Sequence, residues 1–142
     1  MKNLIIRDYQ STDFEQINIL WIATDMGGAH RGDNQETIER TLQNGGKLIV
    51  LEESNKIIGT AWITNDSRRL YLHHFGILPE FQNQGLGKIL VKESLNYAKE
   101  LKLQIKLEVH KDNQIARELY KKAGFNYLGD YHVYIVRDLE NI

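Results

Sequence analysis

A glycine-rich turn is the part of this sequence that points most directly to chemistry. Residues Gln82-Asn83-Gln84-Gly85-Leu86-Gly87-Lys88 lie between an apolar strand pattern and a long amphipathic helix pattern. Glycines at such a junction let the chain turn tightly and let a ligand approach the main chain. The first N–H groups of the helix have no intrahelical partners, and with the helix dipole they form an anion site suited to a pyrophosphate. Lys88 could add a charge-assisted contact.

Two common phosphate-binding motifs do not fit this turn. A P-loop requires G-x-x-x-x-G-K-[ST], but Gln82 stands in the place of the first glycine and Ile89 follows Lys88. A dinucleotide fingerprint requires a third glycine where Leu90 stands. The turn therefore indicates a different phosphate ligand, or else a plain tight loop before a helix.

Histidines on the strand before the turn are candidates for acid–base chemistry. Because side chains alternate along a strand, we expect Tyr71, His73 and Phe75 to share one face, with His74 on the other in a structural role. An unperturbed histidine pKa near 6.5 suits a general base, although His73 could equally be a hydrogen-bonded sheet residue. The histidines lack H-x-x-x-H spacing and a cysteine partner, so no metal site is expected.

Hydrophobic periodicity and turn residues predict the elements that position these groups. Strands are predicted at 4–7, 47–52, 57–64, 70–78 and 104–110, followed by a closing hairpin of 125–128 with 131–137. Helices are predicted after Thr12, at 33–42, at 84–101 and from Asn113 to Ala123, with Thr12–Glu15 and Asp33–Glu36 as capping boxes. Gly76, inside its strand, indicates a bulge or a close backbone approach. The order predicts an α/β fold, with one mixed sheet and helices on its faces.

Composition limits the possible classes of protein. The chain has 142 residues, 42% of them apolar, which suits a single domain spanning residues 1–142. A net charge of −1 argues against nucleic-acid binding, and the lack of cysteine excludes a disulfide scaffold and a cysteine nucleophile. No apolar run is long enough for a membrane span, and the start of the sequence is too polar for a secretory signal. We therefore expect a cytoplasmic protein without nucleic-acid or membrane partners.

Four stretches of the sequence resemble the GNAT superfamily of acetyl-CoA-dependent N-acyltransferases. Gln82-x-x-Gly85-x-Gly87 resembles the family's acetyl-CoA pyrophosphate loop. The run from Asn113 to Phe125, with Ala116, Leu119, Tyr120 and Gly124 at matching spacing, resembles a later family segment. Gly76–Phe81 and Leu107–Val109 resemble the exit of the fourth strand and the fifth strand. The matches cover residues 70 to about 125, and the order of elements extends the resemblance over nearly the whole chain.

The resemblance implies a mostly antiparallel sheet in which the fourth and fifth strands splay apart at a bulge, where Gly76 stands. The pantetheine arm of the cofactor would pair with the opened strand edge like an added strand. Asn113 can cap the helix that follows it, and by resemblance it also contacts pantetheine. The implied cofactor-binding residues are Phe75, Ile77, Gln82, Asn83, Gln84, Gly85, Leu86, Gly87, Lys88 and Asn113.

The resemblance also implies an activity, the transfer of an acetyl group from acetyl-CoA to a primary amine. Because the chain has no cysteine, an acetyl-thioenzyme is excluded, and the amine would attack directly within a ternary complex. Tyr120 matches the family's tyrosine that faces the thioester sulfur, which makes it the candidate general acid. Its alternative is a half-buried tyrosine with a satisfied hydroxyl. His73 is the candidate base, directly or through water, while Tyr71 stands where other members have glutamate, which leaves the base open.

The acceptor and the partners are less defined by the sequence. The glycine-rich segment from Asp25 to Asp33 is where this family usually shapes the acceptor site, and the acceptor could be a small-molecule amine, a peptide N-terminus or a lysine. The last predicted strand, 131–137, could pair across a homodimer. Two other functions are compatible with the sequence: a non-catalytic acyl-CoA-binding or sensing module, and a nucleotide-binding protein of another kind.

Overall fold

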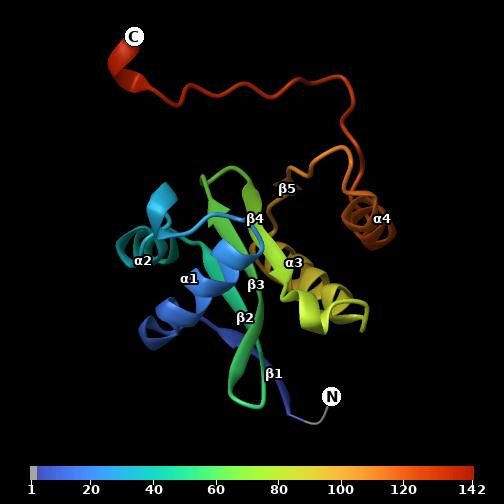
Figure 1. Ribbon diagram of the computed structural model, residues 1–142. Helices are drawn as coiled ribbons and strands as arrows, with labels where there is room; N and C mark the ends of the chain where they lie inside the picture. The colour runs from blue at the N-terminus through green and yellow to red at the C-terminus, as the bar shows by residue number, and fades with distance from the viewer. Residues whose placement is uncertain (1–2) are drawn as a thin grey trace.

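Five strands in the order β1-β2-β3-β4-β5 form the sheet of the computed structural model, which describes residues 3–142 (Figure 1). Strands β1 to β4 pair in antiparallel fashion, whereas β5 lies parallel to β4. This confirms the predicted mixed, mostly antiparallel sheet. The strands are β1 (Leu4–Asp8), β2 (Lys47–Glu53), β3 (Lys56–Asn65), β4 (Leu70–Ile77) and β5 (Ile105–Leu107).

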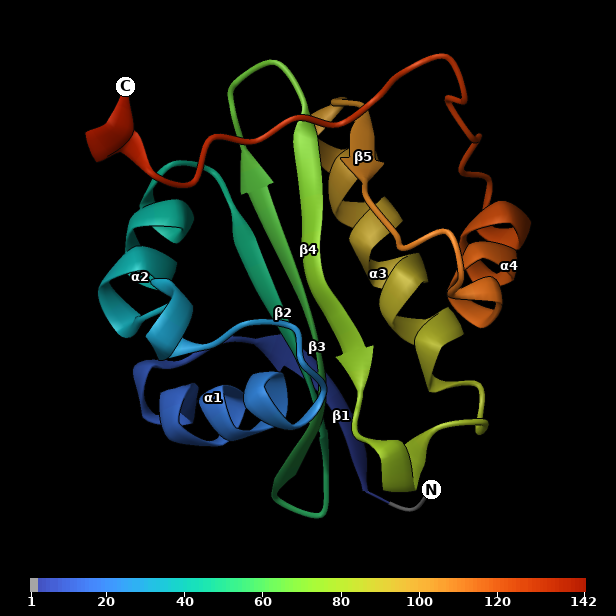
Figure 2. The same cartoon turned by 45° about the horizontal axis from the view of Figure 1, so that its top comes forward.

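Helices cover both faces of the sheet, as predicted (Figure 2). Helices α1 (Phe14–Ala23) and α2 (Gln35–Gln43) pack on one face, and α3 (Leu86–Leu101) and α4 (Gln114–Ala123) lie on the other. No helix within residues 3–142 combines the length and the apolar character needed to cross a bilayer.

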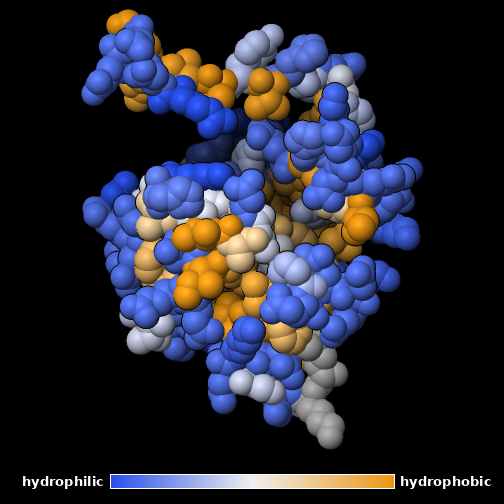
Figure 3. Space-filling view, viewed as in Figure 1, coloured by the Kyte–Doolittle hydropathy of each residue, from blue (hydrophilic) through white to orange (hydrophobic). Residues whose placement is uncertain are grey.

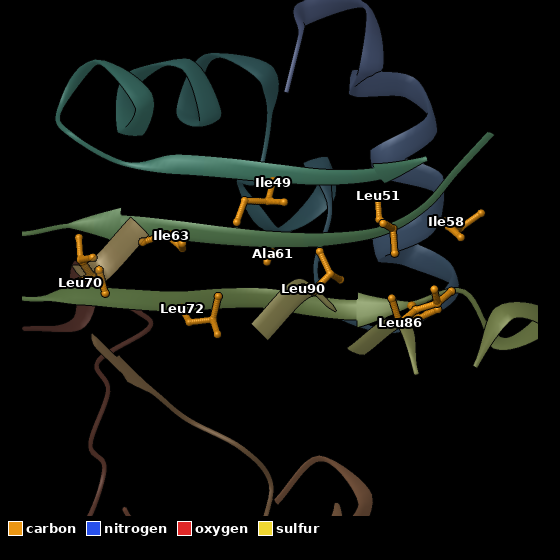
Figure 4. Close-up of a cluster of buried hydrophobic side chains, with 11 residues drawn as sticks. Ile49, Leu51, Ile58, Ala61, Ile63, Leu70, Leu72, Leu86 and Leu90 are labelled. Carbon is orange, nitrogen blue, oxygen red and sulfur yellow. The ribbon is translucent and has the colours of Figure 1, made fainter. Parts of the chain in front are cut away.

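Each face of the sheet has its own buried core. On the α3 side, apolar side chains of the central strands pack against Leu86 and Leu90 of α3 (Figure 4). On the α1 and α2 side the core is built around two tryptophans, Trp21 and Trp62, whose rings stack with centroids 5.3 Å apart. The sheet is therefore held from both sides, which fixes the strands whose ends carry the candidate site.

The helix caps differ from the predictions by one or two residues. Ahead of α1, the backbone N–H of Gln10 donates to the Asp13 carboxylate (2.7 Å), so the cap pairs Gln10 with Asp13 rather than Thr12 with Glu15. Asn34 caps α2 in place of Asp33, by accepting from the Thr37 N–H (2.8 Å). Both aspartates have tertiary partners, since Asp13 pairs with Arg7 and Asp33 pairs with a histidine of β4. The spacing of residues in a capping motif does not predict such tertiary partners.

The predicted C-terminal hairpin is wrong for this structure. Residues 125–138 form no strand, and a short 3₁₀ helix follows at Leu139–Asn141. The segment leaves α4 and runs across to the side of the molecule where α2 lies (Figures 1 and 2). Alternation of apolar residues indicates a strand but does not name its partner.

Candidate active site

A bulge in β4 sets the arrangement of the candidate site. His74 and Phe75 lie opposite the single residue Ala61 of β3, and the left-handed φ of His74 (+43°) accommodates the extra residue. Gly76, where the bulge was predicted, instead pairs regularly with Thr60. The glycine serves a close approach, because a Cβ there would lie 2.8 Å from the sulfur of Met26.

The bulge reverses the alternation of side chains along β4. The rings of His73 and His74 both lie near Trp62 on the α1 face, at centroid distances of 6.3 and 5.1 Å. Phe75 lies on the α3 and α4 face, where its ring meets that of Tyr120 at 5.5 Å. The prediction that Phe75 shares a face with His73, and that His74 points away from it, is therefore wrong, because one inserted residue shifts the phase of the strand.

Buried hydrogen bonds hold the bulge in place. The Trp21 Nε1–H donates to Thr60 Oγ1 (2.9 Å), and the Thr60 hydroxyl donates to the carbonyl oxygen of His74 (2.8 Å). Thr60 is fully buried, so both bonds are shielded from water. These two hydrogen bonds connect α1 and β3 to His74 in the bulge.

His73 is half-buried beside Tyr71. The two rings stack at 4.1 Å, and His73 Nε2 lies 2.9 Å from Thr64 Oγ1. Burial, helped by the neighbouring His74, lowers the pKa of His73 to about 4. The ring is therefore neutral at physiological pH, which a proton acceptor requires.

His74 is held by a carboxylate that the sequence did not connect to it. His74 Nε2 lies 2.9 Å from Asp33 Oδ2, and the same oxygen accepts from the backbone N–H of Gly28 (3.1 Å). A Cβ on Gly27 would meet both side chains, so that glycine permits their contact. The loop expected to shape the acceptor site is thereby fastened to the bulge.

The sheet opens between β4 and β5. Their pairing ends at Leu72 opposite Leu107, whereas β4 continues to Ile77 (Figure 2). Residues 73–77 therefore have no strand partner on this side among the described residues, which leaves backbone groups available to a ligand. Phe75 and Ile77, the predicted backbone partners of the cofactor, both lie along this stretch.

The glycine turn lies directly beyond the open edge. Gly85 adopts a left-handed φ of +80° as the residue before α3, as a tight strand-to-helix turn requires. Gly87 serves packing instead, because a Cβ there would lie 3.1 Å from Leu119 of α4. The Gln82 side chain donates to the carbonyl of Ile77 (2.9 Å) and so fastens the turn to the end of β4.

Tyr120 of α4 approaches the opening from the other face of the sheet. Its buried ring lies between Phe75 and Phe125, at centroid distances of 5.5 and 5.7 Å. Burial raises the pKa of Tyr120 to about 12, so its hydroxyl remains protonated at physiological pH. Asn113 caps the same helix by accepting from the Ala116 N–H (3.2 Å), as predicted.

A cleft of about 920 Å³ separates α3 from α4 and begins at Lys88, beside the glycine turn. It is lined by apolar side chains that include Val91, Leu95 and Leu119 and by three lysines, and the histidines of β4 do not line it. Residues 3–142 contain no group of three or more histidine, aspartate or glutamate side chains placed to hold a metal ion. The arrangement thus offers an anion site, an open strand edge and two groups suited to proton transfer.

The match to known proteins agrees with this geometry. A family model described as the acetyltransferase (GNAT) family matches residues 8–125, so the chain belongs to the GNAT family. That membership makes it an acetyltransferase, with acetyl-CoA as the acyl donor.

Individual proteins extend the comparison. An acetyltransferase of Yersinia enterocolitica is 28% identical over 127 residues, which cover 84% of this chain and 86% of that protein. A [ribosomal protein bS18]-alanine N-acetyltransferase of Haemophilus influenzae is 40% identical over 79 residues, covering 55% of this chain and 53% of that protein. The structure of a predicted acetyltransferase from Clostridium acetobutylicum with acetyl-CoA has a TM-score of 0.74 at 19% identity, covering 93% of this chain and 96% of that one.

Proposed function

We propose that this chain transfers the acetyl group of acetyl-CoA to a primary amine by direct attack in a ternary complex. The observation that carries the proposal is the open edge of β4, residues 73–77, which ends beside the N-terminus of α3. An extended chain of amides and a diphosphate can occupy these two features together. Pantetheine and the pyrophosphate of coenzyme A have that order and that chemistry.

The cofactor would lie along residues that the sequence already indicated. Its pyrophosphate accepts hydrogen bonds from backbone N–H groups between Gln84 and Lys88, while Asn83 and Gln82 shape the turn. Its pantetheine pairs with the backbone of Phe75 and Ile77 and passes Asn113. The cleft between α3 and α4 offers apolar walls and the lysines Lys88 and Lys92 to the nucleotide end.

The proposed reaction uses one group on each face of β4. The amine nitrogen attacks the carbonyl carbon of the thioester. As the C–N bond forms, the nitrogen becomes positively charged and therefore acidic, and neutral His73 takes a proton from the nitrogen, directly or through water. Backbone N–H groups near Ile77 stabilise the oxyanion. When the C–S bond breaks, Tyr120 donates its proton to the departing thiolate. His74 and Asp33 hold the acceptor loop against the bulge and position this chemistry.

Three classes of amine are candidates for the acceptor. The Haemophilus relative is named for an alanine of a ribosomal protein, which supports including peptide N-termini in any screen. Small-molecule amines and lysine side chains complete the set of candidates. Asp25 in the acceptor loop has an exposed carboxylate that pairs with Arg31 (2.8 Å), so a cationic amine would compete with Arg31 for its charge.

An acceptor screen that follows thiol release tests the proposal. Because the chain has no cysteine, a thiol reagent reports only the coenzyme A that is set free. We expect one class of amine to raise thiol release well above the hydrolysis seen without acceptor, and mass spectrometry to find the acetylated amine. Tight acetyl-CoA binding without thiol release from any class would instead identify a non-catalytic acyl-CoA-binding module.

A further inference from the structure

Met26, in the loop that follows α1, lies against Gly76 of β4. A Cβ built on Gly76 would come within 2.8 Å of both the sulfur and the terminal methyl carbon of Met26. The methionine therefore occupies the space that a side chain at position 76 would otherwise fill. Gly76 belongs to residues 73–77, the open edge of β4 along which the cofactor is proposed to lie.

The backbone and the core hold Met26 on the α1 face of the sheet. The Met26 N–H donates to the carbonyl of Trp21 near the end of α1 (2.9 Å). The half-buried side chain of Met26 packs against the core that contains Trp21 and Trp62. Thr60, which pairs with Gly76, also directs its hydroxyl to this side, where Trp21 donates to it. The open side of Gly76 therefore faces α1, and the end of Met26 covers it.

The acyl group of the cofactor would extend toward the same face. In the proposed reaction, Tyr120 protonates the sulfur from the α3 and α4 face, whereas His73 takes a proton from the attacking nitrogen on the α1 face. The acyl carbon is bonded to that sulfur and is attacked by that nitrogen, so it lies between the two groups. The remainder of the acyl group then points to the α1 side of β4, where Met26 covers Gly76.

We propose that Met26 limits the size of the acyl group, so that the site accepts acetyl-CoA and excludes acyl-CoA donors with longer chains. The single methyl group of acetyl fits in front of a residue that has no side chain. A butyryl chain carries two more carbons, which would meet the sulfur and the terminal methyl group of Met26. One methylene in a shaped pocket changes discrimination by roughly 10–200-fold, so this contact is large enough to select the donor. The inference rests on the proposed function.

The space that a shorter residue at position 26 would open is apolar. Beneath Met26 lies the core of the two tryptophans. Figure 3 shows apolar side chains gathered over α1 and the loop after it, and they include Ile19 and Ile22, which are exposed. Apolar space takes up apolar groups rather than water. A hydrocarbon chain longer than that of acetyl therefore fits the space left in Met26→Ala.

Calorimetric binding of acetyl-CoA and butyryl-CoA, without acceptor, tests the inference. In the unmodified chain we expect the Kd for butyryl-CoA to exceed the Kd for acetyl-CoA by at least about tenfold. In Met26→Ala the ratio of the two Kd values should fall to about threefold or less, because the clash is removed. Met26→Leu conserves the volume of the side chain and should keep the discrimination of the unmodified chain.

Variants of Gly76 test the same space from the side of the sheet. Gly76 does not adopt a left-handed φ, so alanine suits its backbone. We expect Gly76→Ala to weaken acetyl-CoA binding several-fold and to leave binding of free coenzyme A, which has no acyl group, nearly unchanged. In the double variant Met26→Ala/Gly76→Ala, the added methyl group should restore part of the discrimination against butyryl-CoA.

A truncation elsewhere in the same core controls for a general loosening of the protein. Leu42 of α2 is half-buried against the core of the two tryptophans, as Met26 is. Leu42→Ala should leave the ratio of the two Kd values unchanged. Once an acceptor amine is known, thiol release from butyryl-CoA should rise by about tenfold or more in Met26→Ala and not in Leu42→Ala.

Three results would count against the inference. Equal Kd values for acetyl-CoA and butyryl-CoA in the unmodified chain would show that the site has no size limit. An unchanged ratio in Met26→Ala, together with unchanged acetyl-CoA binding in Gly76→Ala, would assign the limit to another residue. In both cases the proposed acetyl transfer would stand. Absence of binding by either acyl-CoA would instead overturn the proposed function, and this inference with it.

Discussion

At the scale of single residues, the two groups proposed for proton transfer owe their properties to burial. Burial raises the pKa of Tyr120 to about 12 and lowers that of His73 to about 4. In both cases the neutral form is favoured, because the charged form loses hydration. At physiological pH, a neutral phenol is a proton donor and a neutral imidazole is a proton acceptor, which are the roles that acyl transfer needs.

Replacing Tyr120 with phenylalanine tests the donor. We expect Tyr120→Phe to lower kcat by about 10²-fold, because the thiolate then leaves without a proton donor. Acetyl-CoA affinity should stay within about threefold, since the ring still packs between Phe75 and Phe125. Steady-state thiol release and calorimetric binding measure the two quantities, and unchanged turnover would remove Tyr120 from the mechanism.

The lowered pKa of His73 also predicts how stability depends on pH. In the unfolded chain His73 titrates near 6.5, and in the folded chain near 4, so the unfolded state binds more protons between these values. The free energy of unfolding should therefore fall as the pH drops from about 6.5 to about 4. Urea unfolding at pH 7 and pH 5 measures this loss, which should be smaller in His73→Gln.

His110 gives the matched control for that measurement. Its side chain is exposed, so His110→Gln removes a histidine but not a buried one, and its loss of stability between pH 7 and pH 5 is the reference for His73→Gln. An equal pH dependence in His73→Gln and His110→Gln would show that His73 is not the buried neutral histidine described here.

At the scale of elements, the turn before α3 combines a conformational requirement with an electrostatic one. Gly85 holds a left-handed φ and precedes the N–H groups that the pyrophosphate would contact. No other atom lies within 4 Å of a Cβ built on it, so a side chain there would disturb the turn only through backbone conformation and charge.

Substitutions at Gly85 separate these two contributions. We expect Gly85→Asp to raise the Kd for acetyl-CoA by about 10²-fold, equivalent to about 2.7 kcal/mol, because the carboxylate repels the pyrophosphate. Gly85→Asn has the same shape without the charge and should weaken binding much less, since asparagine tolerates a left-handed φ. Gly32→Asp, also at a left-handed and open position, is the control distant from α3. Equal binding by Gly85→Asp and the unmodified chain, measured by calorimetry, would contradict the loop assignment.

The bulge in β4 depends on the hydroxyl of Thr60. In Thr60→Val the Trp21 N–H and the His74 carbonyl both lose a buried partner, which should destabilise the chain by about 1–3 kcal/mol in urea unfolding. Thr41→Val is the comparison, because it removes the acceptor of the other tryptophan, Trp62, and leaves both hydrogen bonds of Thr60 in place. We expect both variants to lose stability but only Thr60→Val to lose most of its activity. Full activity in Thr60→Val would mean that the bulge does not position the site.

At the scale of the whole molecule, the proposed cofactor would contact elements that are far apart in the sequence. It would bridge the β4 edge, the start of α3 and the cleft beside α4, and thus stabilise the folded state by mass action. At 100 times its Kd, acetyl-CoA should add about 2.7 kcal/mol, which raises Tm by several degrees. Differential scanning calorimetry measures the shift. ATP at the same concentration gives the comparison, and an equal shift with ATP would favour a nucleotide-binding protein of another kind.

Much of the fold follows from local sequence signals. The first four strands and the four helices occupy nearly the ranges that periodicity predicts, whereas β5 covers only Ile105–Leu107 of the predicted 104–110. Gly124 and Asn113 end and begin α4 as expected. The glycine turn and Tyr120 could be found through motif spacing. The turn lies at the start of a helix, and Tyr120 lies at a fixed distance from Asn113 and Gly124 in the same helix. The pairs His74–Asp33 and Trp21–Thr60 had no such signal, since their members are 41 and 39 residues apart.

The sequence by itself determined the types and order of the elements from β1 to α4, the family and the turn suited to a diphosphate, because these depend on short-range periodicity and spacing. Only the tertiary structure decided which face each side chain of β4 occupies, because one extra residue at His74 reverses an alternation that the sequence does not reveal. It also showed that residues 131–137, the last predicted strand, form no strand in this chain. A strand is stable only with a neighbour, and an alternating sequence pattern does not supply one.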